Sequence, residues 1–278
     1  MPKILVTHIN PHLDDIAAFW LFQRFHPDFQ DAELKFLSQH HSPTWENKPV
    51  DSDLDVIHLG VGRGMFDEHR GLPDESTTSL VWKWLKEKKL GPQEEILEKA
   101  IDKFVEQVRL EDTGHFIQRE FSLPSVISGL NIFFRDSIKT SKTIFPILDG
   151  LVEFLKTEVI LDQDWPKRIE FETAWGKGVA LESQSRPYDY GYHRGFEIVI
   201  SLNPVNGWRS IRAKGPSNID LTPVYGKLKE IDLKTDWYFH HSKKMIINGG
   251  DVAPEVKVSR LSLSELIKIV VQSKPSAL

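Results

Sequence analysis

The stretch Lys3-Ile4-Leu5-Val6-Thr7-His8-Ile9-Asn10-Pro11-His12-Leu13-Asp14-Asp15 decides the fold of the N-terminal half of the chain. Its apolar run predicts a β-strand that ends at His8, and the apolar segment 16–25 predicts a helix directly after the two aspartates. Ligands of open α/β sheets bind outside the carboxyl ends of the strands, where this turn lies. His8, His12 and Asp14 are residue types that suit a divalent transition metal. The ordinary alternative is that Asp14 or Asp15 caps the helix and that the histidines are polar loop residues.

The composition narrows the classes of protein that this chain can belong to. Its 278 residues, of which 40% are hydrophobic and 27% charged, are enough for one large or two ordinary domains with packed cores. The absence of cysteine excludes disulfides, zinc ribbons and thiolate nucleophiles, so a metal would be held by His, Asp and Glu. No secretory leader pattern and no run of 18 apolar residues is present, and we therefore expect a soluble, cytoplasmic protein.

The order of predicted elements indicates an α/β fold with two domains. Residues 1–165 alternate short apolar strands with helices, which predicts a mostly parallel sheet flanked by helices. From residue 166 the chain becomes rich in strands, including segments 174–181 and 196–202, so a smaller α/β domain with a mixed sheet is expected over 166–278. Acidic residues outnumber basic ones in the first domain, and the reverse holds in the second. This asymmetry fits a metal-holding domain beside an anion-holding one.

Three further segments of the first domain end in residues that can bind a metal. His58 closes a short apolar strand, Asp67-Glu68-His69 follows a Gly-rich loop, and Asp112 ends a long amphipathic helix. Each has an ordinary explanation when taken alone, because a surface His, a charged turn and a helix C-terminus with Gly114 as its cap are all common. Their shared position at the ends of predicted elements favours convergence on one crevice.

Together these motifs resemble the DHH phosphoesterase superfamily. His8, His12 and Asp14 have the spacing of its first motif, with His12 in place of an Asp. His58 stands where the superfamily has a strand-ending Asp, Asp67-Glu68-His69 corresponds to its Asp-His-His motif, and Asp112-Thr113-Gly114-His115-Phe116 matches its Asp-Thr-Gly-x-Phe motif. Within the superfamily the chain looks closest to the Myg (melanocyte-proliferating-gene) group of metal-dependent exonucleases, whose first motif also carries a second His.

The resemblance implies a set of residue roles. One or two ions of the Mn²⁺ type, or another divalent metal such as Mg²⁺, would be bound. His8, His12 and His58 would hold one ion, and Asp14, Glu68 and Asp112 would hold the other or support the ligands from behind. Asp67 would orient its neighbours, and His69 and Arg70 would contact the phosphate or donate a proton. In the second domain the resemblance implies that substrate is bound by Arg209, Arg212, His241, Lys243, Gly249 and Gly250, although an ordinary solvated strand face explains Arg212 equally well.

The implied function is metal-dependent hydrolysis of a phosphoester, by a phosphodiesterase or a 3′–5′ exonuclease acting on short RNA or single-stranded DNA. The net charge of −5 argues against a grip on long duplexes by charge alone and favours short oligonucleotides or small phosphate esters. Two alternatives remain open: a non-catalytic, metal-dependent nucleotide or RNA binder, and a small-molecule pyrophosphatase or phosphatase. A homodimer is one option for the assembly, and no membrane partner is expected.

Overall fold

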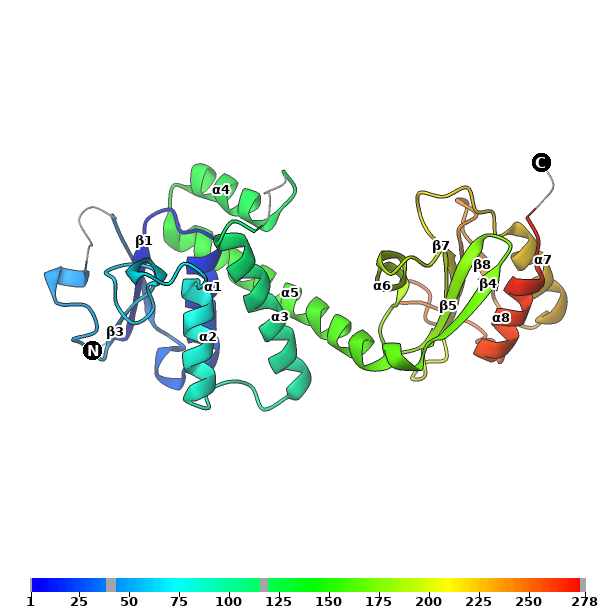
Figure 1. Ribbon diagram of the computed structural model, residues 1–278, viewed down its shortest axis with the longest axis horizontal. Coiled ribbons are helices and arrows are strands. Elements are labelled where there is room, and N and C mark those ends of the chain that lie inside the picture. Colours follow the sequence, from blue (N-terminus) through cyan, green and yellow to red (C-terminus); the bar gives the residue numbers. More distant parts are fainter. Residues whose placement is uncertain (1, 39–43, 116–119, 276–278) are drawn as a thin grey trace. The chain divides into compact units, whose positions relative to one another are not determined.

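The computed structural model describes residues 2–38, 44–115 and 120–275, and these residues form two compact units, Met1–Lys156 and Thr157–Leu278 (Figure 1). The α/β fold class predicted from the sequence is confirmed, with a parallel sheet in the first unit and a mixed sheet in the second. The predicted boundary at residue 165 differs from this division by nine residues. No helix within the described ranges is both long enough and apolar enough to span a membrane.

The first unit is built on a three-stranded parallel sheet with the strand order β2-β1-β3. Parallel neighbours require crossover connections, and α1 supplies the one between β1 and β2. The elements are β1 (Ile4–His8), α1 (Leu13–Phe25), β2 (Glu33–Leu37), β3 (Val56–His58), α2 (Thr77–Glu87), α3 (Glu95–Asp112), α4 (Leu123–Phe134) and α5 (Ser137–Asp164).

Helix α1 is the centre of the first unit's core. Its residues 16–22 are almost completely removed from solvent, and a helix that is apolar on all sides is stable only when it is buried in this way. Phe22 makes edge-on contact with Phe66, and Trp20 does the same with Phe104 on α3. This packing fixes the start of α1, and with it the turn that follows β1, against the neighbouring elements.

The second unit contains a six-stranded sheet with the order β4-β5-β6-β7-β9-β8, in which only β5 and β6 are parallel neighbours. Its larger core cluster includes Val224 of α7 and Leu266 of α8, and a smaller cluster is covered by Tyr188 and Tyr192 of α6. The elements are β4 (Ile169–Thr173), β5 (Gly176–Glu182), α6 (Tyr188–His193), β6 (Ile198–Leu202), β7 (Arg209–Ala213), α7 (Thr222–Ile231), β8 (Tyr238–Phe239), β9 (Met245–Asn248) and α8 (Leu263–Gln272).

The predicted strand over 174–181 is wrong at its start. The structure has a hairpin there, in which β4 and β5 pair antiparallel and Ala174-Trp175 forms the turn. The Thr173 hydroxyl accepts a hydrogen bond from the backbone N–H of Trp175 and donates one to the carbonyl of Gly176. A side chain that bonds to its own turn in this way competes with continuation of the strand.

Candidate metal centre

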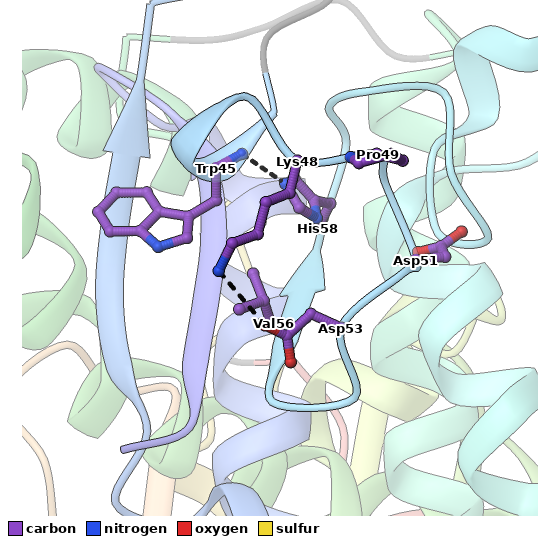
Figure 2. A pocket seen from close by; sticks show the side chains of 7 residues that line it. All are labelled: Trp45, Lys48, Pro49, Asp51, Asp53, Val56 and His58. Carbon is purple, nitrogen blue, oxygen red and sulfur yellow. Dashed lines mark hydrogen bonds and ion pairs between the residues drawn. The ribbon is translucent and has the colours of Figure 1, made fainter. Parts of the chain in front are cut away.

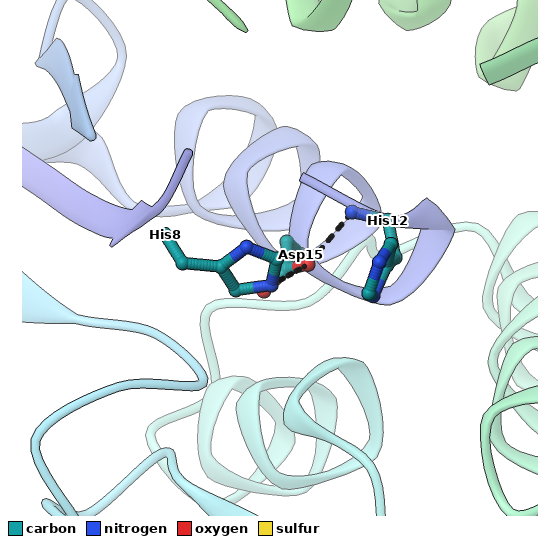
Figure 3. Close-up of side chains that lie close together, drawn as sticks. All are labelled: His8, His12 and Asp15. Atoms are coloured by element: carbon teal, nitrogen blue, oxygen red, sulfur yellow. Dashed lines mark hydrogen bonds and ion pairs between the residues drawn. The ribbon is translucent and has the colours of Figure 1, made fainter. Parts of the chain in front are cut away.

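The turn between β1 and α1 places an ion pair at the carboxyl end of the parallel sheet (Figure 3). His8, the last residue of β1, has its Nε2 atom 3.0 Å from Oδ2 of Asp15. The same carboxylate accepts hydrogen bonds from the Thr7 hydroxyl at 2.7 Å and from the backbone N–H of His12 at 2.8 Å. Asp15 therefore caps the N-terminus of α1 and also fixes the position of His8.

Charge and burial act in opposite directions on this pair. Burial lowers the pKa of His8, but the hydrogen bond and the negative charge of Asp15 outweigh it and raise that pKa to about 9. Burial likewise opposes ionisation of Asp15, whose pKa is nevertheless lowered by His8 and by the hydrogen bonds from His12 and Thr7. At neutral pH the pair is thus an imidazolium and a carboxylate.

Asp14 lies beside this pair and joins α1 to α2. Its two carboxylate oxygens accept hydrogen bonds from the backbone N–H groups of Thr77 and Thr78, each at 2.8 Å, at the N-terminus of α2. A carboxylate is the natural partner of unsatisfied helix N–H groups. Burial, followed by the charges of Asp112 and Asp15, still raises the pKa of Asp14 to about 7. Asp14 is therefore a crowded, fully buried acid with structural contacts of its own.

The third predicted motif supplies two more acids and an exposed imidazole. Asp67 is buried and accepts backbone hydrogen bonds from Arg63 and His69, while its Oδ1 lies 3.0 Å from Nδ1 of His69. Glu68 accepts a hydrogen bond from the Thr77 hydroxyl at 2.7 Å, and its other oxygen lies 3.1 Å from the same His69 nitrogen. Asp67 thus orients His69, whose side chain is 65% exposed.

These residues form three groups of side-chain atoms that could bind a metal, and two of the groups share a residue. Within each group the potential ligand atoms all lie within 4.8 Å of one another. Glu68 belongs to two of the groups, because it neighbours both His69 and the pair formed by Asp14 and Asp112. The groups are His8, His12 and Asp15; Asp67, Glu68 and His69; and Asp14, Glu68 and Asp112.

A cavity of about 400 Å³ opens beside the third group, within the first unit. Its lining includes His12, Asp14 and Asp112 as well as the aliphatic side chains of Val108 and Ile127. Desolvation raises the pKa of Asp112 to about 6, with further contributions from the charges of Glu68 and Asp15. The cavity lining therefore combines aliphatic side chains with acids that bind protons more tightly than ordinary carboxylates.

His58 is the predicted ligand that the structure does not bring into these groups. It is buried at the end of β3, and its Nε2 accepts a hydrogen bond from the backbone N–H of Trp45 at 2.9 Å (Figure 2). Its Nδ1 has no hydrogen-bond partner among the described residues. The ring lines a separate small pocket with Trp45, Lys48 and Asp53, and burial lowers its pKa. In this geometry His58 anchors the loop before β3.

The predicted substrate residues of the second unit differ in how they are held. Arg209 donates from Nε to the carbonyl of Leu261 at 2.6 Å and also binds the carbonyl of Gly207, so its guanidinium is tied to the backbone. The Arg212 guanidinium lies 3.9 Å from the centre of the Tyr188 ring. The remaining four positions are as follows: Lys243 pairs with Asp220 at 3.0 Å, the ring of His241 lies 4.0 Å from that of His240, Gly249 packs against Trp208, and nothing lies within 4 Å of a Cβ placed on Gly250.

Asp15 is the site residue that the sequence analysis did not assign as a ligand. The one usable signal was its position three residues after His12, where an acid completes a capping box at a helix start. That signal indicates a cap and carries no information about a metal. Arg70 is exposed at the end of the short helix Glu68–Arg70, and its role remains a prediction. Phe116, the last residue of the fourth motif, lies outside the described residues.

Comparisons with known proteins give only distant structural likenesses. No family model and no curated protein sequence matches the chain. One solved structure that it resembles is the pGpG-specific phosphodiesterase PggH from Vibrio cholerae, with 13% identity, a TM-score of 0.28, and coverage of 89% of this chain and 92% of that one. Another is the DHH domain of a member of the s1p family of ribosomal proteins, with 12% identity, a TM-score of 0.34, and coverage of 99% and 88%. Both scores are low, so the function proposed below is derived from this chain's own residues.

Proposed function

We propose that this protein is a metal-dependent phosphoesterase that cleaves phosphodiester bonds of short single-stranded nucleic acid, as a phosphodiesterase or a 3′–5′ exonuclease of the DHH type. The observation that carries the proposal is the set of three possible ligand groups at the carboxyl end of a parallel sheet, two of which share Glu68, beside a cavity lined by carboxylates and aliphatic side chains. A structural cap or a solvated turn requires no such convergence. The Myg group is the part of the superfamily that the sequence motifs favour.

The donor set fits Mn²⁺ or Mg²⁺, because it consists of carboxylate oxygens with a few imidazole nitrogens and no thiolate. We assign His8, His12 and Asp15 to one ion and Asp14, Glu68 and Asp112 to a second. A bound ion would lower the pKa of a water molecule and neutralise charge on the phosphoryl group. His8 must lose its proton before it can bind a metal, so metal binding at the first group competes with protons.

His69 is the candidate proton donor. Burial is the largest single influence and lowers its pKa, but the charges of Glu68 and Asp67 and the hydrogen bond to Asp67 together outweigh burial and raise that pKa, so the ring is charged over a wider pH range than free histidine. Its side chain is exposed and fixed from one side by Asp67. These properties suit protonation of a leaving oxygen, and Arg70, next in the chain, is placed to contact the phosphate.

The apolar part of the cavity favours an organic phosphoester over inorganic pyrophosphate. The cavity lining includes the apolar side chains of Val108, Pro124 and Ile127. These side chains cannot hydrogen-bond to a small, fully charged anion, but they can contact a ribose or a base. Within the second unit by itself, Arg212, His241, Lys243 and the Gly250 backbone are the proposed contacts for a phosphate. Arg209 and Gly249 have internal partners that already account for them.

The proposal is tested by product release in Mn²⁺ from a short 5′-labelled RNA, a dinucleotide and pyrophosphate. We expect turnover of the RNA or the dinucleotide, and a loss of about 100-fold in Glu68→Gln and Asp112→Asn, since ligand removal disables the site. Glu87→Gln, an exposed acid at the end of α2, is the matched control and should behave as the wild type. Equal rates in all three variants would contradict the assignment of the site.

A non-catalytic, metal-dependent RNA or nucleotide binder is the second candidate. It is favoured by the partners that the acids of the centre already have within the protein: Asp14 accepts hydrogen bonds from two helix N–H groups, and Asp15 is paired with His8. This candidate predicts bound metal and strand binding with no turnover of any of the three substrates. Metal content measured by mass spectrometry on wild type and Glu68→Gln, beside the release assay, separates it from the enzyme.

A further inference from the structure

The corner between α4 and α5, residues 131–142, carries an unusual concentration of exposed apolar side chains. Phe133 is 79% exposed, Ile132 75% and Ile138 44%. Single exposed hydrophobic residues are ordinary on a protein surface, but three in seven residues mark an interaction surface. The rings of Phe133 and Phe134 lie 5.2 Å apart, so they form one continuous aromatic patch.

The same corner carries three exposed cations, Arg135, Lys139 and Lys142. The Lys139 ammonium lies 4.3 Å from the centre of the Phe134 ring, which places the charge directly beside the aromatic patch. No ion pair is found for any of the three among the described residues. The one acid of the corner, Asp136, caps α5 by accepting a hydrogen bond from the backbone N–H of Lys139. The corner is thus basic and aromatic within an otherwise acidic half of the chain.

Two hydrogen bonds attach this corner to the turn of the candidate metal centre. Asn131 donates from Nδ2 to the carbonyl of Pro11 at 3.1 Å, and the backbone N–H of Asn10 donates to the Ser137 hydroxyl at 3.0 Å. Both bonds reach the turn that lies between His8 and His12. The corner therefore adjoins the site, whereas a surface for an unrelated partner would have no reason to be tied to it.

We propose that the α4–α5 corner binds the part of a single-stranded nucleic acid that extends beyond the reacting phosphate. Bases would stack on Phe133 and pack against Ile132, and the backbone phosphates would contact Arg135, Lys139 and Lys142. Aromatic platforms combined with a positive surface are the common means of holding single strands without sequence preference. Placement of the reacting phosphate rests on the proposed function, while the binding of the strand does not.

The charges favour a nucleic acid over other occupants. Two copies of the corner facing one another would bring together six cations with two acids, which opposes an isologous dimer. A strand, in contrast, needs cations at its outer phosphates, because the acids around Asp112 repel every phosphate that is not beside a metal. An anionic lipid surface offers a similar charge, but it has no reason to lie at the β1–α1 turn.

Binding is measured by fluorescence anisotropy of a labelled eight-nucleotide RNA in EDTA, where no turnover occurs. We expect Phe133→Ala to weaken binding about tenfold through lost stacking. Lys139→Glu with Lys142→Glu should weaken it further and lower the slope of log affinity against log salt by about 0.7 per lost phosphate contact. Leu54→Ala with Lys268→Glu alters an equally exposed apolar residue and a lysine elsewhere, and should bind as the wild type.

The outcomes separate this proposal from the function. If the corner variants bind the strand as tightly as the wild type, the proposal is overturned, even in a protein that hydrolyses RNA. If the wild type shows no turnover and the corner variants lose strand binding, the corner is confirmed as the binding surface. The enzymatic function is then contradicted. If the variants lose binding to phosphatidylserine vesicles and keep the strand, the partner is a membrane and the proposal is again overturned. If the wild type is active, the corner variants should have a higher KM for the eight-nucleotide RNA and an unchanged KM for a dinucleotide.

Discussion

At the scale of single residues, the centre holds more protons than its composition suggests. His8 has a pKa raised to about 9, Asp14 to about 7 and Asp112 to about 6. Each group binds a proton more tightly in the folded chain than in the unfolded one, so each costs stability as pH rises through its window. Asp14 and Asp112 therefore keep their protons to a higher pH than ordinary carboxylates do.

This leads to a prediction for Asp112→Asn in the metal-free protein. The pKa of Asp112 rises from its ordinary value of 3.8 to about 6, so ionisation penalises the folded state progressively between pH 4 and pH 6. The free energy of unfolding of the variant should equal that of the wild type near pH 4 and exceed it by about 1 kcal/mol at pH 7. The difference is small because solvent screens an exposed group. Thermal unfolding over this pH range checks the prediction.

Added Mn²⁺ provides the complementary measurement. Metal binding to the folded state alone stabilises it by mass action, so the wild type should then melt above Asp112→Asn at pH 7. The same order of stability with and without metal would argue against Asp112 as a ligand. Glu87→Gln again serves as the control, because this exposed acid lies outside the three ligand groups.

The residue scale also shows what the sequence could indicate about the site. His8, Glu68 and Asp112 were predictable because they follow a strand, a loop and a helix whose ends meet at one edge of a sheet. Asp15 was not, since two adjacent acids at a helix start differ only in rotation by about 100°. Only the packing of α1 decides that Asp15 faces His8 while Asp14 faces α2.

At the scale of elements, His58 shows how a hydrogen bond to a loop can give a residue another role than its position suggests. Its type and its place at the end of β3 both fitted a ligand. The short helix Trp45–Asn47 lies thirteen residues earlier in the chain, and the backbone N–H of Trp45 reaches the ring of His58. A hydrogen bond to a distant loop is not encoded in local spacing, and sequence patterns therefore cannot anticipate it.

The turn after β9 allows a structural role to be distinguished from a binding role. A Cβ on Gly249 would lie 2.1 Å from the Trp208 ring, and its φ of +89° disfavours any other residue. Nothing lies within 4 Å of a Cβ on Gly250. We expect Gly249→Ala to lower the free energy of unfolding by at least about 2 kcal/mol, and Gly250→Ala to change it by less than about 0.5 kcal/mol.

Denaturant unfolding followed by tryptophan fluorescence measures both variants, and each is the other's control. If Gly249→Ala is as stable as the wild type, the close packing on Trp208 is not what selects glycine there. Strand binding adds a second reading: weaker binding in the stable Gly250→Ala variant would support a ligand contact through that part of the backbone. Unchanged binding would remove Gly250 from the proposed substrate residues.

At the scale of the whole molecule, the class of each half was predictable and several boundaries were not. Apolar strands followed by amphipathic helices indicated the parallel sheet, and the alternating segments after residue 166 indicated the mixed one. The apolar pattern of residues 144–161 predicts a helix over that range, whereas α5 covers Ser137–Asp164 with Pro146 inside it. The polar first turn of α5 and its proline both disfavour a helix in the sequence pattern. Tertiary packing stabilises the helix there, since Thr140 and Ser141 are buried.

The end of α5 and the residue directly after it, Trp165, contain the reason why the second unit begins before the predicted boundary. Trp165 packs with Val179 and Phe196, and its ring centre lies 5.0 Å from that of Tyr190. The Tyr190 hydroxyl in turn donates a hydrogen bond to Asp162. Residues before the predicted boundary therefore complete the smaller core cluster of the second unit.

We accordingly expect a fragment of residues 157–278 to unfold cooperatively and to be more stable than residues 166–278 by about 2 kcal/mol, the scale of losing a half-buried tryptophan. Trp165→Ala in the longer fragment should reproduce most of that loss, which separates the packing of Trp165 from the length of the helix. Thermal unfolding followed by circular dichroism provides the comparison. Equal midpoints for the two fragments would place the boundary at residue 165 and would mean that Trp165 contributes nothing to the stability of the second unit.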